Sequence, residues 1–233
     1  MTKTKRSFSA RVLRSSFKGA LYFIGGSLAL TGVYAVVPVP MTLTMLFDSN
    51  GAKRDWTPLS DISPNLVRAV IAAEDGKYCS HDGFDRDAIE KALARNQQGG
   101  RMRGGSTISQ QTAKNVFLWQ GAGWTRYLRK VPEVYFTFLI EKIWGKRRIM
   151  EVYLNVAETG IGTYGAEAGA QRYYKKSAKN LTRIEAARLA AILPLPKKRA
   201  VNGVGGFTRR YGNSISARIR VVKRDGLDAC IYT

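Results

Sequence analysis

The segment SPNLVRAVIAAED (residues 63–75) carries the helix pattern on which the fold prediction rests. Ser63 followed by proline is typical of a helix start, because serine caps the first turn and proline fits the first helical position. Val67, Val70 and Ile71 then form one apolar stripe at helical spacing. The segment is therefore predicted to be a helix that packs this stripe against a core.

Helical patterns continue along the chain, and the alternation typical of strands is scarce. The 233 residues, 45% of them hydrophobic, suffice for one anchored domain with a core. We therefore expect a mainly α-helical, single globular domain. Its predicted helices cover about residues 64–75, 85–96, 107–118, 132–144, 146–156, 164–174 and 182–193.

The N-terminal region has the pattern of a membrane anchor. No charged residue occurs from Gly19 to Phe47, and the most apolar part, 21–39, is long enough to cross the ~30 Å hydrocarbon layer as a helix. Six basic and no acidic residues precede it, which predicts a cytoplasmic N-terminus. A cleaved signal peptide and a buried hairpin of a soluble fold are the alternatives, although no clear A-x-A cleavage site follows.

The formal net charge of +21 indicates an anionic partner: nucleic acid, acidic lipid headgroups or a phosphorylated substrate. Charge alone does not choose among these. Cys79 and Cys230 could pair in an oxidising compartment, but two thiols far apart in sequence do not make a disulfide framework, so free or incidental cysteines are favoured and the pairing stays open. With one histidine and neither a CxxC nor an HExxH motif, no zinc site is predicted.

Glu74 is the first candidate for chemistry. At 100° per residue it falls on the same face as the apolar stripe, in the last turn of the predicted helix. Desolvation and the helix dipole would both raise the pKa of this carboxyl, which suits a general base near neutral pH. The alternative is a structural carboxylate paired with an arginine.

A second cluster is GGSTISQQTAKN (residues 104–115). Thr107 with Gln110 three residues later predicts a capping box after a glycine turn. Thr107, Gln111 and Lys114 would then share one helix face and offer a hydroxyl, an amide and an ammonium to phosphate or sugar hydroxyls. The spacing of the lysine excludes a P-loop.

A third cluster is RKVPE (residues 129–133). Pro132 predicts a helix start near residue 131, with a kinked continuous helix as the alternative. Glu133 would lie in the first turn, where the helix dipole favours its ionised form. Arg129 and Lys130 beside it are interpreted either as a surface ion pair or as a cationic clamp for a leaving pyrophosphate.

These clusters, in this order, resemble the peptidoglycan glycosyltransferase family, whose domain also occurs in bifunctional penicillin-binding proteins. The resemblance covers about residues 55–196, and no transpeptidase SxxK site follows, so it is to the monofunctional type. The chain departs from the family pattern at two places: Tyr78 replaces a phenylalanine, and Tyr174-Lys175 replaces Phe-Gly. The motifs are EDGKYCSHDG (74–83), the GGSTI segment (104–115), RKVPE (129–133) with Glu141, KRRIMEVYLN (146–155) and a glycine-rich stretch from Gly162 to Lys176.

The resemblance implies a lysozyme-like helical lobe with a smaller membrane-proximal jaw lobe, preceded by one transmembrane helix. It implies polymerisation of lipid II into β-1,4-linked glycan strands, with inversion at the donor anomeric carbon and release of undecaprenyl diphosphate. Glu74 is then the general base. Glu133 would orient the cations or help hold a divalent metal, Mg or Mn, although the sequence requires no cofactor. The substrate-binding residues would be Asp75, Ser106, Thr107, Gln111, Lys114, Asn115, Arg129 and Lys130.

The predicted organisation places the protein in the bacterial inner membrane as a single-pass protein with an extracytoplasmic catalytic domain. The expected partners are lipid II, the growing glycan strand, the membrane, and proteins of cell-wall synthesis and division. Trp119 and Trp124 would rest at the lipid headgroups, or else pack in the core. The expected parts are a cytoplasmic basic segment (1–18), a transmembrane anchor (19–40), a linker (41–60), the glycosyltransferase domain (61–200) and a basic C-terminal tail (201–233).

Two other functions are compatible with parts of the pattern. A muramidase or lytic enzyme would also use two glutamates on a related fold, but the cations at Lys114, Arg129 and Lys130 favour a phosphorylated donor. A membrane-tethered nucleic-acid-binding module is suggested by charge alone, and the sequence has no recognisable nucleic-acid-binding motif.

Overall fold

The computed structural model describes residues 8–97, 105–121, 123–199, 201 and 206–232, and it divides the chain into two units, Met1–Val37 and Pro38–Thr233. The first unit contains α1 (Phe8–Val36), whose stretch Ala10–Val36 is long and apolar enough to cross a membrane. It is one continuous helix, which contradicts the hairpin alternative. The helix begins before the predicted anchor, within the basic flank, and ends just before Pro38.

The second unit contains every helix that the sequence predicts, with ends shifted by at most two residues. Ser63 caps the first of these by accepting from the Asn65 N–H, and Val67, Val70 and Ile71 are fully buried as expected. The helices are α3 (Pro64–Glu74), α4 (Arg86–Gln97), α5 (Ile108–Phe117), α7 (Lys130–Ile143), α8 (Gly145–Val156), α9 (Ala166–Tyr174) and α10 (Arg183–Ile192).

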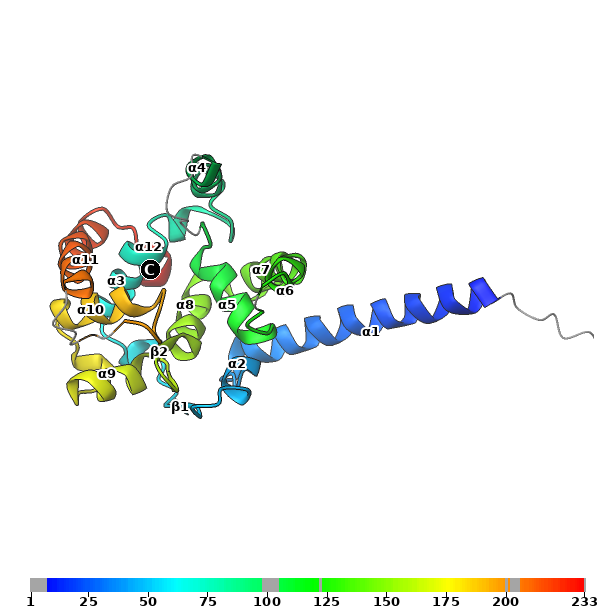
Figure 1. Cartoon of the computed structure of the whole chain (residues 1–233), viewed down its shortest axis with the longest axis horizontal. Coiled ribbons are helices and arrows are strands. Elements are labelled where there is room, and N and C mark those ends of the chain that lie inside the picture. The colour runs from blue at the N-terminus through cyan, green and yellow to red at the C-terminus, as the bar shows by residue number, and fades with distance from the viewer. Residues whose placement is uncertain (1–7, 98–104, 122, 200, 202–205, 233) are drawn as a thin grey trace, which may run out of the picture. The chain divides into compact units, whose positions relative to one another are not determined.

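Two helix groups form the core of this unit (Figure 1). Helix α3 packs against α10 and α11 (Phe207–Arg224), while α5 packs against α7 and α8. A small sheet of order β1-β3-β2 is built from β1 (Lys53–Arg54), β2 (Glu158–Gly160) and β3 (Thr163–Tyr164). The shorter helices are α2 (Leu43–Leu46), α6 (Thr125–Leu128) and α12 (Ala229–Tyr232), with 3-10 turns η1 (Leu59–Asp61), η2 (Tyr78–Ser80) and η3 (Ala178–Asn180).

The segments that were expected to be a linker and a tail are both structured. In the linker, β1 pairs in parallel with β3, with Lys53 opposite Thr163, so this strand joins the sheet of the main unit. In the tail, α11 buries Ile215, Ile219 and Val222 as an amphipathic stripe. The basic residues of α11 lie on its exposed side. Because they dominate the composition of this segment, the apolar stripe that faces the core is difficult to recognise from the sequence.

The two cysteines form a disulfide, which is the alternative that the sequence left open and not the free thiols that it favoured. Cys79 and Cys230 are 151 residues apart in sequence, but the fold brings their Cα atoms within 5.5 Å. Helix α12 packs on α8, and this places Cys230 next to Cys79 in the η2 turn. The long separation of the two cysteines in sequence therefore does not predict their distance in the fold.

The structure shows how the fold accommodates Tyr78 and Lys175, two residues that depart from the family pattern. Tyr78 is fully buried, and its added hydroxyl donates to the Lys146 carbonyl at 2.7 Å, so the ring and the oxygen are both accommodated. Lys175 ends α9 in the left-handed conformation with φ +56°, and it is the one non-glycine residue with positive φ in the described part of the chain. The glycine of the family pattern is the residue best suited to this position.

Candidate active site

Glu74 ends α3 and faces α5. Its Oε2 accepts a hydrogen bond from Gln111 Nε2 at 2.9 Å, and burial raises the pKa of its carboxyl, as the sequence predicts. The Gln111 hydrogen bond and the charges of Arg199 and Lys114 act in the opposite direction. The Glu74 carboxylate is thus kept partly desolvated and without a salt bridge, which contradicts the arginine-paired alternative within the described residues.

Lys114 lies one turn beyond Gln111 on the same face of α5. Burial lowers the pKa of its ammonium, and the nearby positive charges of Arg129 and Lys130 lower it further. Glu74 and Glu133 both act on Lys114 with the opposite sign, so this lysine lies within electrostatic reach of both glutamates. The three clusters that the sequence singles out therefore meet in one site.

The RKVPE cluster forms the start of α7. Glu133 is only 2% exposed and pairs with Lys130 Nζ at 2.5 Å and with Arg129 Nε at 3.7 Å. Helix α7 begins at Lys130, close to the predicted start, and Arg129 joins it to α6 with helical dihedral angles. The burial of Glu133 contradicts the surface-ion-pair alternative.

The Arg129–Glu133 pair leaves hydrogen-bonding capacity unused. Arg129 Nε and Glu133 Oε2 are both buried and have no hydrogen-bond partner, although Arg129 also donates from Nη1 to the Trp119 carbonyl at 2.9 Å. Buried polar atoms are rarely left unpaired. The arrangement can accept a further polar group, such as a phosphate oxygen on the Arg129 side.

The side chains of Asp75 and Thr107, which were expected to contact substrate, form hydrogen bonds within the protein. Asp75 is buried, lies 2.9 Å from His81 Nε2 and accepts from the Ile108 N–H at 3.0 Å. Thr107 forms the predicted capping box with Gln110 and donates to the Gly83 carbonyl at 2.7 Å. These contacts tie the loop of the first motif to the start of α5.

Gly83 lets this loop approach α7 closely. It has φ +87°, and a Cβ atom there would lie 2.8 Å from Thr137 Cγ2 and 2.9 Å from Glu141 Cγ. Glu141 in turn accepts from Ser109 at 2.5 Å and pairs with Lys146 at 2.8 Å. The glycine is therefore needed both for its backbone conformation and for its lack of a side chain.

The remaining predicted residues lie at the edges of the site. Ser106 Oγ accepts from Lys130 Nζ at 3.5 Å, which connects the second and third clusters, and Asn115 is half-buried on α5. Gly104, where the second motif begins, lies outside the described residues. The substrate contacts predicted for Asp75, Ser106, Thr107 and Asn115 stay predictions.

Two further residues belong to the site and were not singled out from the sequence. Tyr153 is buried on α8, and its hydroxyl lies 3.4 Å from Gln111 Oε1. Its position in the KRRIMEVYLN motif is the signal that would have found it. Arg199 follows α10, and its charge acts on Glu74. No motif marks this arginine, because only the packing of α10 beside α3 brings it near.

Glu133 is the one residue that was expected to help hold a divalent metal. Among the described residues no group of three or more His, Cys, Asp or Glu side chains is arranged to hold a metal ion. Glu133 Oε2 is an unpartnered carboxylate oxygen, and Mg²⁺ is commonly held by one or two carboxylates together with substrate phosphates. Glu133 therefore fits as a single protein ligand that would need a phosphorylated substrate to complete the site.

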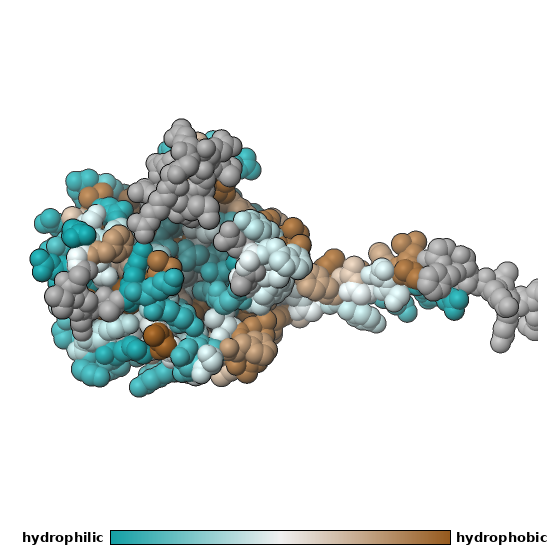
Figure 2. Space-filling view, viewed as in Figure 1, coloured by the Kyte–Doolittle hydropathy of each residue, from teal (hydrophilic) through white to brown (hydrophobic). Residues whose placement is uncertain are grey.

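Apolar side chains are exposed around α2, α6 and the start of α7, a set that we call the apolar rim. Trp124 is 70% exposed, which contradicts core packing for this residue, and Trp119 is 45% exposed. Figure 2 shows apolar residues gathered over α2, and Gln120 donates to Thr44 at 3.1 Å to join α2 to the loop after α5. The rim consists of Met41, Leu43, Leu46, Phe47, Trp119, Trp124, Tyr127, Leu128, Val131, Val134 and Phe138.

Comparison with known proteins gives consistent matches. The family model described as "Transglycosylase" matches residues 41–220. The chain is 47% identical over 228 residues to "Biosynthetic peptidoglycan transglycosylase" of Caulobacter vibrioides, which covers 96% of this chain and 98% of that protein. It is 48% identical over 207 residues to the protein of the same description from Rhodospirillum centenum, with 87% and 88% covered. For the Jannaschia sp. protein of that description the identity is 44% over 237 residues, with 98% and 96% covered.

Proposed function

Because this chain belongs to the transglycosylase family and is a peptidoglycan glycosyltransferase of cell-wall synthesis, we propose that it polymerises lipid II with Glu74 as the general base. The proposed role of Glu74 is supported by the environment of its carboxylate. Its carboxylate is desolvated, held by Gln111 at 2.9 Å and free of a salt bridge among the described residues. Such a carboxylate accepts a proton more readily than one in water.

The proposed reaction is a single displacement. Glu74 takes the proton from the sugar 4-hydroxyl of one lipid II, and that oxygen attacks the anomeric carbon of the growing chain. The bond to the undecaprenyl diphosphate breaks as the new bond forms, so an α-linked donor gives a β-1,4 linkage. The proton remains on Glu74 until it exchanges with water.

The leaving diphosphate needs charge neutralisation more than protonation. Lys114, Arg129 and Lys130 supply positive charge on one side of the site, and such preorganised charges stabilise a developing anion strongly. Glu133 orients Arg129 and Lys130 through its two ion pairs. We propose the same carboxylate as the protein ligand for a divalent cation, Mg or Mn, which would supply further charge neutralisation at the diphosphate.

We further propose a single-pass topology in the bacterial inner membrane, with the N-terminus cytoplasmic and the catalytic unit outside. The basic flank of α1 supports this orientation by the positive-inside rule. The Cys79–Cys230 disulfide supports it independently, because disulfides persist in oxidising compartments. The apolar rim would contact the bilayer that holds the lipid-linked substrate. Partners among cell-wall and division proteins stay a prediction.

Polymerisation of labelled lipid II by the purified full-length protein tests the activity. We expect longer glycan strands from lipid II and no shortening of finished glycan, whereas the opposite result would assign the chain to the hydrolases. For the base, Glu74→Gln should lower kcat by about 10²–10⁴-fold while lipid II still binds. Glu90→Gln, an equal charge change at an exposed residue of α4, is the matched control.

A further inference from the structure

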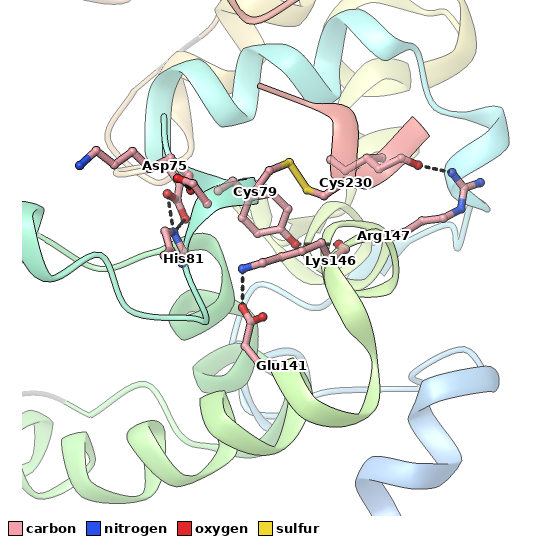
Figure 3. The surroundings of a disulfide bond; sticks show 11 residues. Asp75, Cys79, His81, Glu141, Lys146, Arg147 and Cys230 are labelled. Carbon is pink, nitrogen blue, oxygen red and sulfur yellow. Dashed lines mark hydrogen bonds and ion pairs between the residues drawn. A yellow bond between two sulfur atoms is a disulfide. The ribbon is translucent and has the colours of Figure 1, made fainter. Parts of the chain in front are cut away.

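The C-terminal segment from α11 to α12 contacts the catalytic machinery at several separate points. Its last helix, α12, packs on α8, and Cys230 within it is bonded to Cys79. Cys79 lies in η2, between Asp75 and His81 of the first motif (Figure 3). The covalent bond therefore reaches the loop that follows Glu74 directly.

That loop is fixed by a short series of contacts. The Tyr78 N–H donates to the Asp75 carbonyl at 3.1 Å, and the Asp75 carboxylate lies against His81 and the Ile108 N–H. His81 Nδ1 accepts from the Gly83 N–H at 3.1 Å, so its Nε2 carries the proton that faces Asp75. A displacement of Cys79 would be transmitted through these contacts to the end of α3.

The same segment also holds α3 itself. Arg68 on α3 pairs with Asp228 at 2.7 Å and lies over the ring of Tyr232 at 5.5 Å. At the end of α3, the Tyr211 hydroxyl donates to the Ala73 carbonyl at 3.2 Å, next to Glu74 in the chain. Helix α3 is thus held near its middle and at its catalytic end by residues of α11, α12 and the turn between them.

We propose that residues 211–232 are a positioning element for Glu74, and that the Cys79–Cys230 disulfide links this element covalently to the loop after Glu74. The bond forms by thiol–disulfide exchange: the two thiols lose two protons and two electrons to a disulfide oxidant, which becomes a dithiol. The positioning element is then completed only where such an oxidant is present, outside the cytoplasm. This inference rests on the proposed role of Glu74, and it adds a redox requirement for full turnover.

The first test compares oxidised and reduced enzyme in the lipid II assay. Full-length wild type is measured with and without dithiothreitol, beside a Cys79→Ser, Cys230→Ser double variant under both conditions. We expect reduction to lower kcat of the wild type three- to tenfold with KM changed less than twofold. The double variant should match reduced wild type, and dithiothreitol should not affect it further.

A structural role alone would give a different result. Folded fraction and Tm are therefore followed by circular dichroism, and kcat is expressed per folded enzyme. Unchanged kcat per folded enzyme after reduction overturns the proposal, as does titration of two free thiols in the protein isolated from cells. Absence of polymerisation by oxidised wild type would instead overturn the proposed function.

A second variant tests the contact at the other end of the element. Tyr211→Phe removes the hydrogen bond to the Ala73 carbonyl and keeps the ring. Its matched control is Tyr174→Phe, which removes a hydrogen bond of the same 3.2 Å length to the Glu185 carbonyl. We expect a two- to fivefold lower kcat and a shifted acid limb of the pH–rate profile for Tyr211→Phe only. Identical kinetics of the two variants would overturn the positioning role of Tyr211.

Discussion

The side-chain amide of Gln111 donates to the carboxylate of Glu74 at 2.9 Å, and so joins α5 to the C-terminal end of α3. The amide stabilises the ionised carboxylate, whereas burial disfavours it. Burial is the larger influence, so the pKa of Glu74 lies above its ordinary value of 4.5. A carboxylate held in this way is more basic than one in water, which suits the proposed role of Glu74 as a general base.

Removal of the Gln111 side-chain amide should shift the acid limb of the pH–rate profile. Gln111→Ala eliminates the hydrogen bond that lowers the pKa of Glu74, so the pKa rises further and the acid limb of kcat/KM shifts to higher pH. The position of the limb is measured from pH–rate profiles, independently of any loss in rate. Gln120→Ala, in the exposed loop after α5, should leave the limb where it is. A limb at unchanged or lower pH in Gln111→Ala would contradict this account.

The raised pKa of Glu74 also has a consequence for stability. The folded state holds this proton more tightly than the unfolded chain, so ionisation of Glu74 destabilises the fold above its folded-state pKa. Well below 4.5 the carboxyl is protonated in both states and the effect is absent. Glu74→Gln should therefore raise Tm at pH 8, by about 2–4 °C for each kcal/mol relieved, and not at low pH. Thermal unfolding at both pH values checks this, and an equal change at both would refute it.

Lys130 is expected to act on the leaving group rather than on the fold. It is half-exposed while it pairs with Glu133, so its ammonium can reach both the carboxylate and a bound diphosphate. Lys130→Met should weaken binding of undecaprenyl diphosphate about tenfold, the value of one charge-assisted hydrogen bond of roughly 1.5 kcal/mol. Calorimetric titration measures this. Lys142→Met, at an exposed position near the other end of α7, is the control and should bind normally.

Lys175 occupies a backbone conformation that suits glycine. Its φ of +56° at the end of α9 is unfavourable for a residue with a Cβ atom. Lys175→Gly should therefore stabilise the protein by about 0.5–1 kcal/mol, because relief of this strain exceeds the added entropy of the unfolded chain. Lys175→Ala keeps the Cβ atom and should give no gain. Chemical denaturation of the three proteins measures the difference, and equal stabilities would show that the position carries no strain.

Local patterns in the sequence were enough for most of the helices. Spacing of apolar residues and caps such as Ser63 and Thr107 depend on neighbours within one or two turns, so they can be read without the fold. Helix α11 was missed because six basic side chains in its sequence obscure the stripe of Ile215, Ile219 and Val222. The strands were missed because they contain only two or three residues each, too few for a periodic pattern.

The candidate residues and their chemical types follow from the amino-acid sequence alone: two glutamates in different settings, three cations and an apolar N-terminal span. Which of these residues meet depends on the folded arrangement of the helices. It brought Lys114 within electrostatic reach of both Glu74 and Glu133, brought Arg199 within reach of Glu74, and joined Cys79 to Cys230. Periodicity and capping act over a few residues and can be recognised locally, whereas these contacts depend on how α3, α5, α7 and α11 pack against one another.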